Sequence, residues 1–192
     1  MQLTKLTESL YSALYHDISE FRSTFDLPVA DPASLDQSAD TLHSSLAIEE
    51  LTELAEADCK AEQADAIVDT VYVLMGRLVH LGATDYTQSL EITYLIDLLL
   101  HVASNRGIDF KQCWDEVHSS NMSKVCRNQR EYDETEAFYA EQGIKLMAVE
   151  KGPFIIAKCA EDYVSESKTV RKGKVLKSVY YRPADLATLT QQ

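Results

Sequence analysis

Two short acidic motifs follow each other between residues 48 and 69. The first reads Glu-Glu-x-x-Glu over residues 49–53, and the second reads Glu-x-x-Asp-x-x-x-Asp over residues 62–69. Both lie in segments with helical apolar spacing, so carboxylates three or four positions apart share one helix face. Like charges on one face repel, and acids beside a buried stripe are costly unless they are paired or bind a metal. A hard divalent cation, which prefers several oxygen ligands, best explains the pattern.

Two facing helices would bring these acids together. The second motif falls within an arc of roughly 60° on its helix, and Tyr72 continues near that face. The first motif follows Leu46 at helical steps. The candidate metal ligands are Glu50, Glu53, Glu62, Asp65 and Asp69. Such a set could hold one or two magnesium ions, although the same spacing also fits a solvated acidic helix surface.

Composition limits the classes of partner. The 192 residues carry a formal net charge of −13, and 45% of them are hydrophobic. A protein that binds nucleic-acid phosphates would show a basic patch, so we expect no nucleic-acid partner. We also expect no membrane partner, because no apolar run is long enough to span one and the first residues lack a signal-peptide core. Four scattered cysteines without metal-binding spacing indicate buried thiols and a cytoplasmic location.

The apolar spacing predicts a mainly α fold with a helical bundle, a small C-terminal β-hairpin and an extended tail. We expect one domain, with a helical catalytic core over 1–124 and a hairpin insertion and basic tail over 125–192 packed on it. Gly82 fits the end of the third helix. The expected helices cover residues 7–25, 40–57, 61–80, 89–104, 109–124 and 134–142, and the expected strands cover 145–149 and 154–158.

The fifth expected helix offers a second functional signal. Phe110, Trp114 and Val117 form an inward stripe, and the same steps continue to Asn121 and Lys124. An amide and an ammonium at these positions could point into a cleft, where the lysine neutralises phosphate and the asparagine orients substrate or water. Alternatively, the helix has left the core by this point.

One histidine needs a separate reading. Asp115 and His118 form an acid-x-x-His step, which is also found in bundles that hold two iron ions with carboxylates. A second matching step is absent from the sequence, so we rank this reading low. The sequence also has no Gly-rich phosphate loop and no nucleophile elbow.

Taken together, these segments resemble the all-alpha nucleoside triphosphate pyrophosphohydrolases, in particular the group similar to MazG and phosphoribosyl-ATP pyrophosphohydrolase. Residues 65–76 resemble its Asp-Ala-x-x-Asp-x-x-Tyr-Val-x-x-Gly helix, and residues 116–124 resemble its Glu-Val-His-x-Ser-Asn-Met-Ser-Lys segment. Residues 173–177 and 183–186 are similar to its tail. The likeness spans nearly the whole chain, and Ser-Asn-Met-Ser-Lys is its most specific part.

The resemblance implies a helical core, a homodimer or homotetramer, and cleavage of a nucleoside triphosphate or related nucleotide between the α- and β-phosphates. The products would be a nucleoside monophosphate and pyrophosphate, and the cofactor Mg²⁺, with Mn²⁺ as a possible substitute. By position, Glu50, Glu53, Glu62 and Asp65 would be metal ligands, Glu49 and Asp69 supporting acids or ligands of a further ion, and Asn121 and Lys124 substrate-side groups.

The expected reaction is attack of water on phosphorus. Glu49 or Glu53 could accept the proton from this water if it is not a metal ligand. Tyr72 could contact the substrate, and Lys174 and Lys177 of the basic tail could fold over the phosphates. Two other functions remain open: a non-enzymatic acidic helical module that binds a protein, and the less favoured di-iron carboxylate bundle.

Overall fold

The computed structural model describes residues 3–165 and 169–191. Contacts within the chain define two compact units. The first contains residues 1–118 and 185–192, and the second contains residues 119–184. The sequence suggested a division after residue 124, whereas the contacts divide the chain after residue 118 and again after residue 184.

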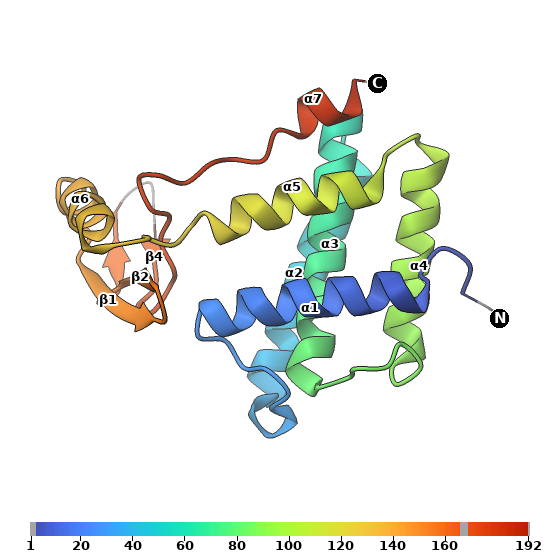
Figure 1. Ribbon diagram of the computed structural model, residues 1–192, viewed down its shortest axis with the longest axis horizontal. Helices are drawn as coiled ribbons and strands as arrows, with labels where there is room; N and C mark the ends of the chain where they lie inside the picture. Colours follow the sequence, from blue (N-terminus) through green and yellow to red (C-terminus); the bar gives the residue numbers. More distant parts are fainter. Residues whose placement is uncertain (1–2, 166–168, 192) are drawn as a thin grey trace. The chain divides into compact units, whose positions relative to one another are not determined.

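The first unit is a helical bundle built around α3 (Lys60–Leu81). Figure 1 shows α3 in the middle of this unit, and α1, α2, α4 and α7 each pack against it. The other helices are α1 (Glu8–Thr24), α2 (Gln37–Glu56), α4 (Leu90–Asn105), the first part of α5 (Phe110–Met122) and α7 (Leu186–Thr190), with a 3₁₀ turn, η1 (Pro32–Ser34). The expected mainly α fold is therefore confirmed. The segment of α7 was expected to be extended, and this expectation was wrong.

The ends of α3 are fixed by local chemistry. At its start, the side chains and backbone of Cys59 and Glu62 form a reciprocal capping box. At its end, Gly82 adopts a left-handed conformation with a φ of 74°, and its N–H bonds to carbonyls of the last turn. Between these caps, most side chains from Ala64 to His80 are buried. By contrast, α2 has one buried residue, Ala47.

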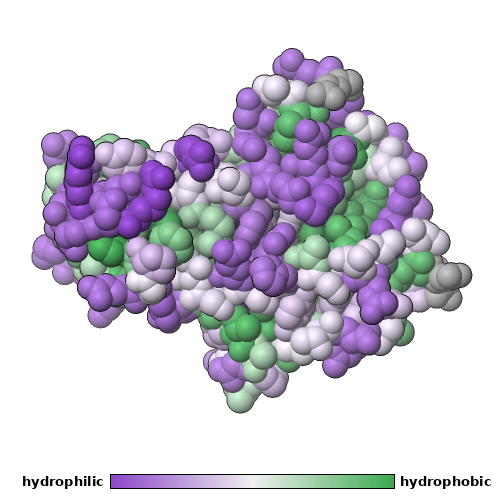
Figure 2. All heavy atoms as spheres, viewed as in Figure 1, coloured by the Kyte–Doolittle hydropathy of each residue, from purple (hydrophilic) through white to green (hydrophobic). Residues whose placement is uncertain are grey.

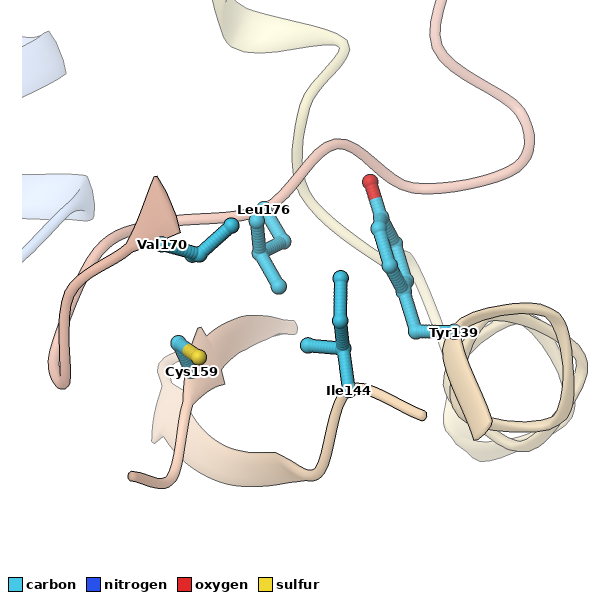
Figure 3. Close-up of a cluster of buried hydrophobic side chains, with 5 residues drawn as sticks. All are labelled: Tyr139, Ile144, Cys159, Val170 and Leu176. Carbon is cyan, nitrogen blue, oxygen red and sulfur yellow. The ribbon is translucent and has the colours of Figure 1, made fainter. Parts of the chain in front are cut away.

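The second unit combines a helix with a small antiparallel hairpin. Helix α6 (Gln129–Ala140) lies beside strands β1 (Leu146–Lys151) and β2 (Phe154–Cys159), which pair in antiparallel register, and two short strands, β3 (Tyr163–Val164) and β4 (Thr169–Val170), form a second pair. The side chains of Tyr139, Ile144, Cys159, Val170 and Leu176 meet in its core (Figure 3).

The expected hairpin is confirmed, but the helix before it begins earlier than expected. The side chain of Asn128 accepts a hydrogen bond from the backbone N–H of Glu131, and this cap starts α6 at Gln129 instead of Glu134. The charged residues before Glu134 thus belong to the helix. Their charges pair along it, as in the bond from Arg130 to Glu134.

The molecular surface agrees with the charge of the chain. Hydrophilic residues cover much of the face drawn in Figure 2, with hydrophobic patches between them. Among the described residues, none of the helices has both the length and the apolar content that a membrane crossing requires.

Candidate functional site

Helices α2 and α3 form an antiparallel hairpin, joined by the short link around Asp58. At the open end, Arg77 donates to Asp40 with an Nη2–Oδ1 distance of 2.7 Å. One turn further along α2, Nε2 of His43 lies 3.3 Å from Nδ1 of His80. Nearer the link, Glu53 of α2 lines the same cavity as Glu62 and Asp65 of α3. The two acidic motifs consequently lie opposite each other near the closed end.

The closed end of this hairpin contains an acidic cavity of about 300 Å³. Its lining residues are Glu53, Glu56, Ala57, Asp58, Glu62 and Asp65. The structure thus brings Glu53, Glu62 and Asp65 together at one cavity, and their role as metal ligands stays a prediction. The sequence analysis missed Glu56 and Asp58. Glu56 follows Glu53 by three positions, which places both on one face of α2 and could have revealed it.

Glu50 is the acid whose proton affinity the structure changes most clearly. Partial burial, followed in order by the negative charges of Asp69, Glu53, Glu49 and Asp65, raises the pKa of its carboxyl to about 7. Burial and the charge of Glu53 also raise the pKa of Asp65, although that residue keeps contact with solvent. These shifts show that the carboxylates lie close enough for their charges to repel one another.

Glu62 behaves differently, because its carboxylate is already engaged. Its Oε2 accepts the backbone N–H of Asp58 at 2.8 Å and that of Cys59 at 3.2 Å. Hydrogen bonds from these two groups lower the pKa of Glu62. Cys59 itself is exposed, unlike the other three cysteines, and serves as the cap of α3. The expectation of a buried thiol was wrong at this position.

The donor set fits a hard divalent cation in kind and in charge, because several carboxylates repel one another and supply oxygen ligands. The side-chain positions do not form a ready coordination shell. Within the described part of the chain, no three His, Cys, Asp or Glu side chains stand close enough together to hold one ion. Glutamates such as Glu49 and Glu53 are exposed and can rotate, so binding would require the acids to converge further.

The same hairpin carries a second cavity, of about 160 Å³, toward its open end. Its apolar walls come from α1, α2, α3 and the loop after α1: Ile18, Phe21, Leu27, Leu46, Tyr72 and Val73. Arg22, His43 and Gly76 complete it. Tyr72 is largely buried, and its hydroxyl lies 3.0 Å from Nδ1 of His118. Tyr72 lines this cavity. Its contact with substrate stays a prediction.

His118 belongs to the same group of contacts. Its Nε2 lies 3.7 Å from a carboxylate oxygen of Glu20, and its ring lies beside Tyr72. The sequence could not show this arrangement, because Glu20, Tyr72 and His118 come from three different helices.

The other predicted substrate groups belong to the second unit. Nζ of Lys124 donates to Oδ1 of Asn121 at 2.6 Å, so these two groups contact each other. Nζ of Lys177 lies over the ring of Tyr181, 4.2 Å from its centre. Lys174 is exposed. The roles of these four residues in phosphate binding stay predictions.

Comparison with known proteins identifies the segment that contains both cavities. Residues 18–91 match the family model of phosphoribosyl-ATP pyrophosphohydrolase. The resemblance inferred from the motifs is thus confirmed for the segment that includes α2 and α3. The chain is also 34% identical over 86 residues to an uncharacterized protein, L479, of Acanthamoeba polyphaga mimivirus. That alignment covers 44% of this chain and 32% of the relative, so the chain spans about a third of the relative's length. No solved structure matches the chain.

Proposed function

We propose that this protein is a magnesium-dependent nucleoside triphosphate pyrophosphohydrolase, which cleaves between the α- and β-phosphates. One observation carries the proposal. Carboxylates from α2 and α3 gather around Glu50, and its burial together with their negative charges raises its pKa to about 7. They do so within the segment that matches the phosphoribosyl-ATP pyrophosphohydrolase family model. A site that concentrates negative charge in this way is suited to a polyphosphate only when cations neutralise both.

The side chains divide the work as follows. Glu50, Glu53, Asp65 and Asp69 would hold Mg²⁺, and Glu62 would join them after releasing the backbone of the α3 cap. When bound, Mg²⁺ neutralises phosphate charge and lowers the pKa of water. Glu49, or Glu53 if it is free of the metal, would accept the proton of the attacking water. Both are exposed, so they can reach solvent and the cavity.

The decisive experiment measures pyrophosphate release from a panel of nucleoside triphosphates with and without Mg²⁺. Glu53→Gln should lower turnover by about 10²–10⁴-fold, since it removes a ligand or the proton acceptor while keeping the side-chain volume. Glu141→Gln provides a matched control, because Glu141 is exposed and lies in the second unit. Wild-type turnover in Glu53→Gln with an unchanged circular dichroism spectrum would remove the proposed ligand set. Absence of any Mg²⁺-dependent release would favour a non-enzymatic protein-binding module.

We also propose that the protein forms a homo-oligomer. Helix α2 exposes Leu42, Leu46 and Ile48, and Ile48 retains 64% of its accessible surface. Helix α2 fully buries one residue against its own chain, and its exposed apolar side chains, Leu42 and Leu46 on one face and Ile48 on another, are available to a second copy. Light scattering should give the mass of a dimer or tetramer, and Ile48→Glu should lower that mass. Val164→Glu is the control, because Val164 is equally exposed but lies in the second unit. A monomeric wild-type protein would contradict this part.

A further inference from the structure

Two arginines near the open end of the α2–α3 hairpin differ in their partners. Arg77 pairs with Asp40. Arg22 is 7% exposed, its Nε donates to the backbone carbonyl of Pro28 at 2.6 Å, and burial lowers its pKa. Among the described residues, no carboxylate forms an ion pair with Arg22. Its place in the last turn of α1 offers the partial negative charge of a helix end, which compensates only part of a buried full charge.

One set of proton positions on the nearby histidines satisfies every hydrogen bond from Ser34 through His80 to His43. The hydroxyl of Ser34 donates its only proton to the carbonyl of Asp31, so it can only accept from Nε2 of His80. Burial lowers the pKa of His80 and holds that of His43 at about 4, so both rings are neutral at pH 7. With its proton on Nε2, His80 accepts at Nδ1 from Nε2 of His43. Nδ1 of His43 is therefore left as a hydrogen-bond acceptor.

Arg22 and His43 both lie beside Gly76, and all three residues line the 160 Å³ cavity. A Cβ on Gly76 would lie 3.6 Å from Nη1 of Arg22 and 3.9 Å from Cε1 of His43, the carbon between its two ring nitrogens. The aromatic rings of Phe21 and Tyr72 also line this cavity, with their centres 5.3 Å apart. A cavity of this size is smaller than the roughly 300–1,000 Å³ of drug-sized ligand sites. It suits one flat ring system better than a whole nucleotide.

The position of the cavity relates it to the acids. Leu46 lines the cavity, and Glu50 follows it by one helical turn on the same face of α2. On α3, Tyr72 lines the cavity, and Asp69 precedes it by three positions. A ligand with its flat ring beside Gly76 would thus have its remaining groups directed along the hairpin toward the carboxylates.

We propose that this cavity is the base site of the nucleotide, and that Arg22 and His43 select bases whose entering edge carries an oxo group beside a ring N–H. Hypoxanthine, guanine and uracil have this edge, whereas adenine and cytosine present an amino group beside an unprotonated nitrogen. The guanidinium of Arg22 donates to the oxo group and Nδ1 of His43 accepts the ring N–H. This inference rests on the proposed nucleotide hydrolysis and names its specificity-determining residues.

The first test measures binding of inosine and adenosine 5′-monophosphates without added metal. These two molecules differ at the proposed edge, and the chain has one tryptophan, Trp114, whose ring centre lies 5.1 Å from that of Tyr72. A ring bound against Tyr72 should change the fluorescence of Trp114. We expect inosine monophosphate to bind about tenfold or more tightly, because adenine leaves Arg22 and His43 without partners. Equal binding, or tighter binding of adenosine monophosphate, would overturn the assignment.

Variants then connect the preference to the residues. Arg22→Met should bring the binding ratio close to one, whereas Arg77→Met, which removes an arginine outside this cavity, should keep it. If Arg22→Met fails to fold, His43→Phe gives the same readout, because it keeps a ring and removes the acceptor. A ratio that stays at the wild-type value in folded Arg22→Met or His43→Phe would exclude these residues as the selecting groups.

A competition assay separates this inference from the proposed activity. Inosine and adenosine triphosphates are mixed with Mg²⁺, and the kcat/KM ratio is measured. Pyrophosphate release without a preference for the oxo base would exclude the base site and leave the hydrolase intact. A binding preference for inosine monophosphate without any pyrophosphate release would exclude the hydrolase and support the base site.

Discussion

The two ends of the α2–α3 hairpin carry uncompensated charges of opposite sign. At the open end, Arg22 carries a buried positive charge, and no carboxylate among the described residues pairs with it. At the closed end, burial of Glu50 and the negative charges of its neighbours together raise its pKa to about 7. The two ends are only a few helical turns apart, yet the charges at one end do not pair with those at the other.

We propose from this difference that each end is completed by a ligand. A single substitution could supply an opposite charge at either end, as the ion pair of Arg77 with Asp40 on the same two helices shows. A nucleotide accompanied by a divalent cation would supply an oxo group to one end and the cation to the other. The following predictions test this comparison by changing one end of the hairpin at a time.

The largest effect is expected from Glu50→Gln. Activity should fall by about 10²–10⁴-fold, since a metal-ligating carboxylate is lost. Thermal stability of the metal-free protein at pH 8 should rise, because one of several mutually repelling charges is removed. Pyrophosphate release measures the loss of activity, and differential scanning fluorimetry with and without Mg²⁺ measures the change in thermal stability. A lower melting temperature without metal would show that the charge of Glu50 stabilises the fold, contrary to its raised pKa.

The pH dependence follows from the same carboxyl. The folded pKa of Glu50, about 7, lies above the 4.5 that is usual for a glutamate, so the folded state binds the proton more tightly. Stability of the metal-free protein should therefore fall as the pH rises from 4.5 to 7. Mg²⁺ competes with this proton, so its affinity should rise roughly tenfold between pH 6 and pH 8.

Isothermal titration calorimetry at pH 6, 7 and 8 measures this change. The dependence should disappear in Glu50→Gln, which has no proton to lose. A pH-independent affinity in the wild-type protein would mean that Glu50 is not among the groups that bind the cation.

The acidic end could be predicted from the sequence, because helical periodicity alone places carboxylates three and four apart on one face. The second motif lies on α3, whose C-terminal end was also predicted from Gly82. The sequence could not show which acids are buried and which are already hydrogen-bonded. Glu62 is engaged by the helix cap and Glu50 is half-buried, and this difference depends on how α2 packs against α3.

The open end could not be predicted. Arg22, His43 and Gly76 lie on three helices, and no spacing within one segment connects them. The proton positions on His43 depend on Ser34 and His80, which are contributed by a 3₁₀ turn and by the end of α3. Local periodicity reports one helix face at a time, whereas a cavity of this kind exists only after several elements have packed.

The smallest effect concerns Gly76 and sharpens the comparison at the open end. A Cβ at this position would meet its nearest neighbours at 3.6 and 3.9 Å, which are ordinary contact distances, so Gly76→Ala should fold without strain. Because alanine has the higher helix propensity, the substitution should stabilise α3 by up to about 1 kcal/mol, or roughly 2–4 °C in melting temperature. The added methyl group would nevertheless narrow the space where the base edge lies, so binding of inosine monophosphate should weaken. A variant that gained stability and kept full affinity would show that the ligand does not use the wall at Gly76. Loss of both would show that the helix requires glycine there for packing.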